Sequence, residues 1–173
     1  MRAREEALKH DVLLSLLDYD PETGVFRWKR VTSNRQKVGG IAGQRCKGAV
    51  IIQINGWRYM AHRLAWFYVH HRWPKEEIDH INRRPDDNRL VNLRQATRNE
   101  NNRNVGRKSH NTSGFKGVTK HKQYKREKWM AQILVDKRNI YLGVFDTPDE
   151  AHAAYCVASK RYHGDFGRAD NAV

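Results

Sequence analysis

Residues 78–101 read IDHINRRPDDNRLVNLRQATRNEN, and this stretch decides how the middle of the chain folds. Thr97 and Glu100 have the spacing of a capping box, in which each side chain accepts a hydrogen bond from the other residue's backbone N–H. That pattern predicts a short helix over residues 98–104. The preceding residues, 78–96, predict a short, irregular segment with a polar loop between two brief apolar runs.

Three polar residues of this stretch have the chemistry that metal-assisted hydrolysis requires. Asp79 offers a hard oxygen ligand for Mg²⁺ or a similar cation, and His80 beside it titrates near neutral pH. Asn101 lies one turn into the predicted helix, where its amide oxygen can complete a metal site facing Asp79. Adjacent strand residues point to opposite sides, so Asp79 and His80 serve one site only if the chain bends there. An isolated Asp-His pair is more often structural, and the weight lies in its combination with the loop and the helix.

Outward from this stretch, the elements on the N-terminal side are set by apolar spacing and turn residues. Asn55-Gly56 between two β-branched or aromatic runs is a strong hairpin signal, because a type I′ turn needs positive φ at both positions. The predicted elements are a helix over 3–17, a turn at 20–24, a strand from Val25, a polar loop over 32–48, this hairpin, and a helix over 61–71 that ends before Trp73-Pro74.

On the C-terminal side, residues 106–113 are rich in Gly, Ser, Asn and Lys, which is typical of a linker. Thr147 and Glu150 form a second capping box with Pro148 at the first helical position, which predicts a helix over 148–162. Three strands precede it, over 115–120, 129–135 and 140–145. We therefore expect an α+β chain with an N-terminal helix over 1–18, one domain over 19–105, the linker, and a second domain over 114–170.

The charge of the chain indicates a polyanionic partner. Its 33 Lys and Arg against 19 Asp and Glu give a formal net charge of +14. Such a surface attracts nucleic acid, because each neutralised phosphate releases condensed counterions. A membrane-binding protein would show a long Lys-rich amphipathic helix or a lipidation signal, and the sequence has neither. The alternative left open is a basic protein without a polyanionic partner.

The two cysteines, Cys46 and Cys156, lie far apart and form no CxxC motif. This excludes zinc fingers that are built on four cysteines, or on paired cysteines and paired histidines. We expect both to be plain thiols. In the absence of a signal peptide or a run of about 18 apolar residues, we expect a soluble, cytoplasmic protein.

The stretch quoted above resembles the HNH endonucleases of the phage homing type, and the resemblance extends over roughly residues 19–105. It implies a ββα-metal fold that cleaves DNA with one divalent cation and leaves 5′-phosphate ends. It also implies a bacterial or phage-infected cell as the setting. The matching residues are Ile78-Asp79-His80-Ile81-Asn82, Asp87-Asn88-Arg89, Asn92-Leu93-Arg94, Thr97 and Glu100-Asn101, with Ala61 to Trp66 and Trp73-Pro74 upstream.

This resemblance implies a role for each residue of the motif. His80 corresponds to the general base that activates water, and Asp79 and Asn101 to the two protein ligands of the metal. Asn92 corresponds to the central asparagine, which braces the loop and orients the histidine. The third letter of the motif is Asn rather than His. That favours Mg²⁺, or Mn²⁺ and similar cations, over zinc, because an amide oxygen is a poor zinc ligand.

The second domain resembles the plant ethylene-response-factor (Apetala-type) DNA-binding domain over about residues 113–165. Such domains also occur at the C-terminus of phage HNH endonucleases. The resemblance implies a small three-stranded antiparallel sheet packed on one helix, with the sheet laid into a DNA groove. The matching residues are Gly114-Phe115-Lys116-Gly117-Val118, Lys128-Trp129, Ala131, Ile133, Tyr141-Leu142-Gly143-Val144-Phe145, Thr147, Glu150-Ala151, Ala154-Tyr155 and Ala158.

The DNA contacts carry over only in part. Thr119, His121, Leu134 and Asn139 stand where the plant family often has Arg or another polar reader, so sequence preference does not transfer. Arg63 and Arg94 have two interpretations, either steadying the scissile phosphate or simply contacting backbone, and His62 is expected to be structural. The candidate DNA contacts are Arg63, Arg94, Arg103, Lys116, Lys120, Lys122, Trp129 and Tyr141.

The sequence thus predicts a metal-dependent DNA endonuclease that nicks duplex DNA. We expect it to act as a monomer or weak dimer, with one divalent cation per site and no small-molecule cofactor or membrane partner. The main competing hypothesis is a non-catalytic DNA-binding regulator on a nuclease fold. Two further hypotheses are a nuclease that acts on RNA and, for the second domain alone, a protein-interaction module.

Overall fold

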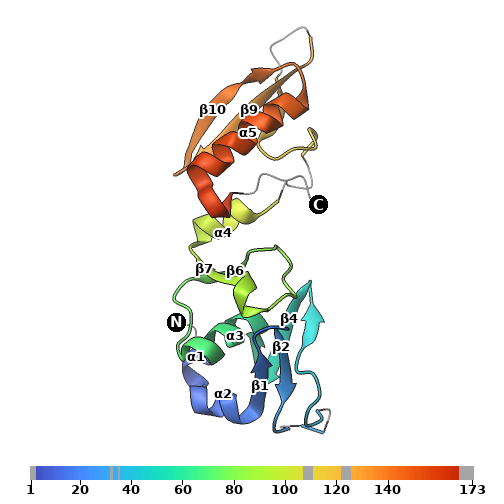
Figure 1. Cartoon of the computed structure of the whole chain (residues 1–173), viewed down its shortest axis with the longest axis vertical. Coiled ribbons are helices and arrows are strands. Elements are labelled where there is room, and N and C mark those ends of the chain that lie inside the picture. The colour runs from blue at the N-terminus through green and yellow to red at the C-terminus, as the bar shows by residue number, and fades with distance from the viewer. Residues whose placement is uncertain (1–2, 32, 35, 107–110, 122–125, 168–173) are drawn as a thin grey trace. The chain divides into compact units, whose positions relative to one another are not determined.

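Short helices and small antiparallel sheets make up the chain, which confirms the α+β class. The computed structural model describes residues 3–31, 33–34, 36–106, 111–121 and 126–167. It divides into two units, Met1–Arg98 and Asn99–Val173, and most of their elements are labelled in Figure 1. Within the described ranges, no helix is both long and apolar enough to cross a membrane. Of the predicted linker, residues 107–110 lie outside the described residues.

The first unit begins with two helices, α1 (Ala3–Ala7) and α2 (His10–Leu16), where the sequence predicts one over 3–17. The helix is interrupted because Lys9 has extended backbone, with φ −74° and ψ 151°. Helix α2 then ends at Leu16, since the next residue already belongs to a strand. The apolar spacing that suggested one helix instead reflects burial in a single core, by Leu8, Leu13, Leu16 and Leu17.

A hairpin of β1 (Leu17–Asp20) and β2 (Val25–Trp28) follows, joined by the predicted turn. The Asp20 carboxylate accepts hydrogen bonds from the Glu22 backbone N–H at 2.9 Å and the Thr23 hydroxyl at 2.7 Å, which stabilise this turn. Gly24 closes it with a φ of +72°. The turn packs against the polar loop of the motif, through a backbone hydrogen bond from Leu90 to Pro21.

The next sheet has the order β3 (Gln44–Cys46), β4 (Ala49–Ile54), β5 (Trp57–Met60). Its β4–β5 hairpin is confirmed, with Asn55 and Gly56 at φ 48° and 82°. Strand β3 lies inside the predicted polar loop. It is an edge strand with all three residues exposed, so no apolar alternation marks it in the sequence.

Helix α3 (Ala61–His70) packs its apolar stripe into the core of this unit and ends at His71, in the left-handed conformation. Trp73 stacks on Phe67 just beyond the helix, at a ring-centroid distance of 4.2 Å. The α3 stripe consists of Ala61, Leu64, Ala65 and Phe67, all buried. This core is the support for the strands that follow.

Residues 78–96, for which the sequence predicts irregular structure, contain an antiparallel pair: β6 (Glu77–His80) and β7 (Leu93–Ala96), preceded by a 3₁₀ turn, η1 (Leu90–Asn92). The strands are only four residues long, and too few of their residues alternate for the period to show. Helix α4 (Arg98–Asn104) then begins and ends as predicted.

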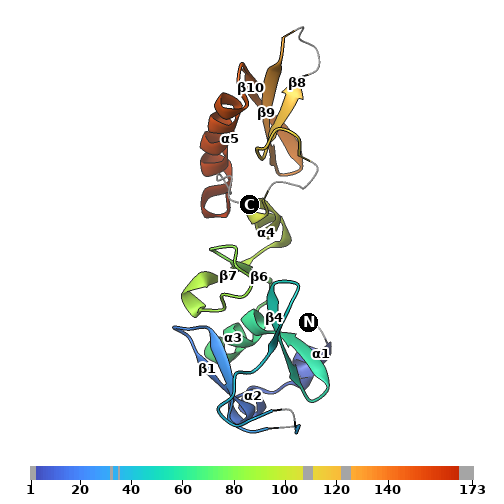
Figure 2. The ribbon, with the colours of Figure 1, turned by 90° about the vertical axis from the view of Figure 1, so that its right-hand side faces the viewer.

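The second unit contains a sheet of order β10–β9–β8, with one helix against it. Its strands are β8 (Val118–His121), β9 (Lys128–Val135) and β10 (Arg138–Phe145), followed by helix α5 (Pro148–His163) and a 3₁₀ turn, η2 (Gly164–Phe166). Figures 1 and 2 both show α5 lying along one face of the sheet. The predicted three-stranded sheet packed on a helix is therefore confirmed, as is the Thr147/Glu150 capping box.

Strand alternation assigns the sheet residues to two faces. The face toward α5 carries Val118, Ala131 and Ile133, which are buried with Ala151 and Tyr155 of the helix. The opposite face, here called the outer face, carries the residues between them, as the register of the strands requires. The outer face consists of Thr119, His121, Lys128, Met130, Gln132, Leu134, Asn139, Tyr141 and Val144.

Candidate functional site

The β6–β7 pair positions the Asp-His pair. Asp79 stands opposite Arg94 and His80 opposite Leu93, and both side chains of the pair are buried. Strand β6 ends at His80, whose backbone carbonyl accepts a hydrogen bond from the N–H of Arg83 at 2.8 Å. Arg83 has a φ of 62°, so the chain turns directly after this strand, and that Asp79 and His80 serve one site stays a prediction.

Asp79 pairs with a cation of the chain itself. Its Oδ2 accepts hydrogen bonds from Arg94 Nε at 2.9 Å and Arg94 Nη2 at 2.8 Å. The side chains are 6% and 18% exposed, so the ion pair is largely shielded from water. A buried carboxylate needs such compensation. Arg94, a candidate phosphate contact from the sequence, is thus held by the carboxylate that the sequence assigns to the metal.

His80 is oriented by Asn88, a motif residue to which the sequence assigns no role of its own. Asn88 is 2% exposed, and its Oδ1 lies 3.3 Å from His80 Nε2. The Asn88 Nδ2 donates to the Asp86 carbonyl at 3.3 Å, so Oδ1 accepts and His80 Nε2 donates. In neutral imidazole, the other nitrogen, Nδ1, then carries the lone pair that can take a proton.

The surroundings of His80 favour its neutral form. Burial lowers the pKa of His80 below its ordinary value of 6.5, while the Asn88 hydrogen bond and the nearby Asp79 act in the opposite direction. The ring of His62 stands edge-on to that of His80, with centroids 5.0 Å apart. A neutral imidazole near physiological pH is the form that a general base needs.

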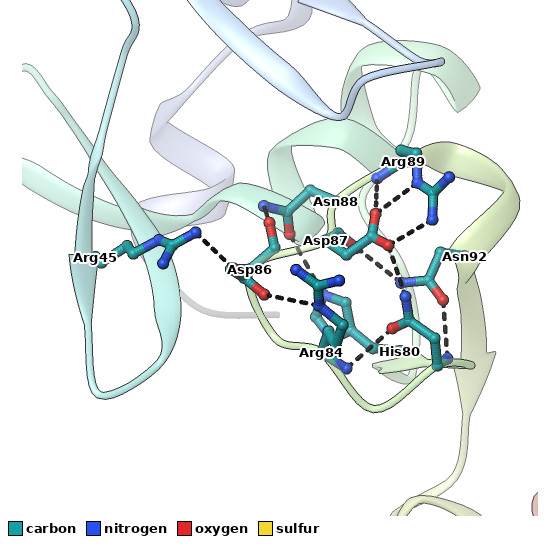
Figure 3. A network of polar contacts seen from close by, with 9 residues as sticks. Arg45, His80, Arg84, Asp86, Asp87, Asn88, Arg89 and Asn92 are labelled. Atoms are coloured by element: carbon teal, nitrogen blue, oxygen red, sulfur yellow. Dashed lines mark hydrogen bonds and ion pairs between the residues drawn. The ribbon is translucent and has the colours of Figure 1, made fainter.

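Asn92 braces the loop between the two strands. It is 5% exposed, and its Oδ1 accepts from the Asn82 backbone N–H at 2.9 Å while its Nδ2 donates to the Asp87 carbonyl at 2.8 Å. These two bonds hold both arms of the loop, as Figure 3 shows. In this geometry, Asn88 contacts the His80 ring, and Asn92 forms hydrogen bonds with the loop backbone.

Ion pairs also hold this loop, which joins β6 to β7. Asp87 pairs with Arg89 at 2.7 Å, and hydrogen bonds from Arg89 lower the pKa of the Asp87 carboxyl well below its usual range. Asp86 pairs with Arg45 of β3 at 2.6 Å and with Arg84 at 3.8 Å (Figure 3). Arg45 and Arg84 are mostly exposed, so these pairs orient the loop and add little to stability.

The β1–β2 turn supports the loop from the core side. The Tyr19 hydroxyl donates to the Asn88 carbonyl at 2.7 Å, and the Leu90 N–H donates to the Pro21 carbonyl at 3.1 Å. A Cβ at Gly24 would lie 2.4 Å from the Arg89 backbone nitrogen. Neither Tyr19 nor Gly24 is marked as a site residue in the sequence, because only the tertiary fold brings the turn to the loop.

The donor atoms suit a hard divalent cation. Asp79 supplies carboxylate oxygens, and a carboxylate has about four lone-pair sites, enough for Arg94 and a cation together. Within the described part of the chain, no group of three or more His, Cys, Asp or Glu residues could hold a metal. Asn101 lies on α4, in the second unit, and its part in metal binding stays a prediction.

The candidate DNA contacts lie in varied environments. Arg63 forms a bidentate pair with Glu5 at 2.9 Å and is 13% exposed. Lys116 Nζ donates to two carbonyls at the end of α4, and Arg103 lies 3.3 Å from Asp136. These three cations are held by the protein, so their contact with DNA stays a prediction.

The remaining candidates divide between the two faces of the sheet. Trp129 packs against the cluster beneath α5, and Lys120 stands opposite it in register, paired with Glu127 at 2.5 Å. Tyr141 lies on the outer face and is 62% exposed. Lys122 lies outside the described residues. Of these, Tyr141 is the one on the face that α5 leaves open.

Comparison with known proteins relates the stretch over residues 78–96 to a known family. Residues 59–103 match the model of the HNH endonuclease family, so the chain contains an HNH endonuclease domain. The chain also has distant similarity to AP2-type DNA-binding proteins of plants.

The plant relatives are much longer proteins. APETALA2-like protein 2 of Oryza sativa is 41% identical over 92 residues, which is 53% of this chain and 17% of that protein. The AP2-like ethylene-responsive transcription factor ANT of Arabidopsis thaliana is 35% identical over 81 residues, or 43% of this chain and 14% of that protein. The chain therefore spans less than a fifth of the curated relatives that it matches. No solved structure matches it.

Proposed function

We propose that this protein is a divalent-metal-dependent DNA endonuclease that nicks duplex DNA and leaves 5′-phosphate ends. One observation carries the proposal: His80, at the end of β6 and directly beside Asp79, is buried and forms a hydrogen bond with Asn88. Burial also lowers the pKa of His80, which favours the neutral imidazole. The HNH match over residues 59–103 supports the reaction class. In chain order, β6, β7 and α4 follow the ββα-metal pattern that the resemblance implies.

In this proposal, His80 Nδ1 removes a proton from water, and the resulting hydroxide attacks the phosphorus atom. A new P–O bond forms while the bond to the 3′ oxygen breaks, and that oxygen leaves and takes up a proton from solvent. Asn88 keeps the imidazole in the tautomer that can accept the proton. Asp79, with Asn101 as the second ligand that the resemblance implies, would hold the cation. Such an ion supplies charge stabilisation of the phosphate and of the leaving oxygen.

The second unit would anchor the enzyme on the duplex. The net charge of +14 and the similarity to plant AP2-type proteins support this role. One active site per chain cuts one strand, so the expected product is a nick, and the expected working state is a monomer or weak dimer. A cytoplasmic setting in a bacterial or phage-infected cell belongs to the same proposal.

A second candidate function is supported by one specific contact. Arg94 already neutralises Asp79, which lowers the affinity of that carboxylate for a cation. A DNA-binding regulator on a nuclease fold, without catalysis, would keep such an ion pair. The two functions differ in one measurable property, cleavage.

The experiment incubates supercoiled plasmid with the full chain and Mg²⁺, Mn²⁺ or EDTA. Nicking is expected with a divalent cation and not with EDTA. His80→Ala should slow it by at least about 100-fold, the usual contribution of a general base. The matched control is His70→Ala, a histidine at the end of α3, which should nick like the wild type. Equal nicking by wild type and His80→Ala would overturn the assignment of the base, and no nicking with any cation would favour the regulator.

A further inference from the structure

The outer face of the second unit carries mainly amide and apolar side chains, although the protein as a whole is basic. Gln132 of β9 and Asn139 of β10 carry the amide groups of this face, and Asn139 is exposed. Met130, Leu134 and Val144 add apolar side chains, of which Leu134 is 58% exposed. The only lysine or arginine among the described residues of this face is Lys128, and its ammonium pairs with Asp146.

The two amide groups are available to a ligand. Within the described ranges, neither the Gln132 nor the Asn139 side chain is hydrogen-bonded to another part of the protein. Their neighbours across the sheet are Tyr141, opposite Gln132, and Leu134, opposite Asn139. Each amide group therefore lies beside a large exposed side chain, on a surface that α5 leaves open.

Duplex DNA is the occupant that the charges favour. Three exposed basic residues lie near the ends of the strands: Arg126 shortly before β9, Lys137 in the β9–β10 turn and Arg138 at the start of β10. They can contact phosphates at both ends of the sheet. Phosphate contacts of this kind position a protein on the duplex without reading its sequence. The sequence must then be read by the side chains of the outer face itself.

We propose that the outer face reads A·T base pairs. An Asn or Gln amide group matches the N7 acceptor and N6 donor of adenine in the major groove, and apolar side chains match the methyl group of thymine. Guanine is read by Arg or Lys, and the outer face offers no unpaired basic side chain of these two types among its described residues. Gln132 and Asn139 are the specificity-determining residues, with Met130, Leu134 and Val144 beside them. This proposal rests on the duplex binding proposed above.

The test measures binding of the full chain to two fluorescent duplexes in EDTA, at one fixed salt concentration. The duplexes share length and flanks, and their central base pairs are all A·T in one and all G·C in the other. Binding to the A·T duplex should be about tenfold tighter or more, because a good bidentate contact discriminates by a factor of about 5 to 150. A selection from random duplexes should enrich A·T-rich sequences.

Two variants connect the preference to this face. The Gln132→Ala/Asn139→Ala double variant should bind the two duplexes within about threefold of each other, and Gln132→Arg should shift the preference toward G·C. The matched control is Gln53→Ala, an exposed amide on β4 of the first unit, which should keep the wild-type preference.

Equal binding to both duplexes by the wild type, or tighter binding to G·C, would overturn the A·T proposal and leave duplex anchoring intact. An A·T preference that survives in the double variant would overturn the assignment to the outer face. Binding to neither duplex would instead overturn the proposed function itself.

Discussion

At the scale of single residues, His80 and Asp79 are each held by a different side chain. Asn88 fixes the imidazole of His80, and Arg94 balances the charge of Asp79. The proposed base and the proposed metal ligand, adjacent in the sequence, therefore contact separate neighbours. Each neighbour can be removed alone, which makes the two roles separable by experiment.

The first prediction concerns Asn88 as a positioning residue. Asn88→Ala removes the acceptor for His80 Nε2, so the imidazole loses its fixed tautomer, and nicking should slow by about tenfold or more. Affinity for duplex DNA should stay within about twofold. The ¹⁵N chemical shifts of the His80 ring report the tautomer directly and should change in the variant. Unchanged ring shifts together with unchanged nicking would contradict the positioning role.

The second prediction concerns the buried ion pair. Arg94→Ala leaves the Asp79 carboxylate buried without its guanidinium, which should lower the free energy of unfolding by about 3–5 kcal/mol. Mg²⁺ should raise the melting temperature of this variant more than that of the wild type, because the cation then meets an uncompensated charge. Arg98→Ala, an exposed arginine of α4, is the control and should change stability by less than about 0.5 kcal/mol. A stable Arg94→Ala variant would show that the pair does not matter to the fold.

At the scale of secondary-structure elements, each candidate surface depends on an element that packs beside it. The β1–β2 turn supports the loop that carries Asn88, and α5 covers one face of the β8–β10 sheet and leaves the other open. Substitutions at these contacts between elements should therefore change the free energy of unfolding.

The third prediction tests the support of the loop. Gly24→Ala places a Cβ 2.4 Å from the Arg89 nitrogen at a φ of +72°, so it should cost at least about 1–3 kcal/mol and slow nicking. Gly48→Ala is the matched control. It has a φ of +82° but no atom within 4 Å of the added Cβ, so it carries the backbone strain without the collision. If the two variants lose the same stability and the same activity, the turn does not support the loop.

The fourth prediction concerns the contact of α5 with β9. His163 Nε2 donates to the Leu134 carbonyl at 3.0 Å, and burial lowers the pKa of His163 below 6.5, with Arg103 and Lys116 adding to the shift and Asp136 opposing it. Protonation therefore favours the unfolded chain. Stability should be fully present above about pH 6.5 and should fall as the pH decreases below that value.

The measurement is urea unfolding of the wild type and His163→Gln between pH 5 and pH 8, values chosen to span about 6.5, the pKa of an unperturbed histidine. Gln keeps a nitrogen donor for the Leu134 carbonyl but does not titrate. The variant should therefore lose less stability on acidification than the wild type. Parallel pH profiles for the two proteins would mean that His163 does not contribute.

At the scale of the whole molecule, the net charge of +14 should govern the proposed binding to DNA. The fifth prediction is that Lys137→Glu/Arg138→Glu reduces the slope of log affinity against log salt by about two, because each lost phosphate contact removes about one unit. The control, Lys160→Glu/Arg161→Glu, makes the same charge change on exposed residues of α5. If both double variants change the slope equally, net charge alone drives binding and the edge of the sheet has no special part.

Much of the fold could be predicted because its signals are local. The Asn55-Gly56 turn, the Thr147/Glu150 capping box and helix α4 depend on residues within a few positions of each other, and all three appear as expected. The break at Lys9, strand β3 and the β6–β7 pairing could not be predicted in this way. Strand β3 has only three residues, all exposed, and β6 and β7 have four residues each, so these segments are too short to show a period of their own.

The sequence by itself determined the motif from Asp79 to Asn101, the basic charge and the order of three strands and one helix in the second unit, because these follow from residue chemistry and short-range spacing. Only the tertiary structure decided that Asn88 holds His80, that Arg94 neutralises Asp79, and that Gln132 and Asn139 share the outer face. The physical reason is that burial and strand register join residues whose separation in the chain carries no signal. A side chain's partner, and with it much of its chemistry, is set by that packing.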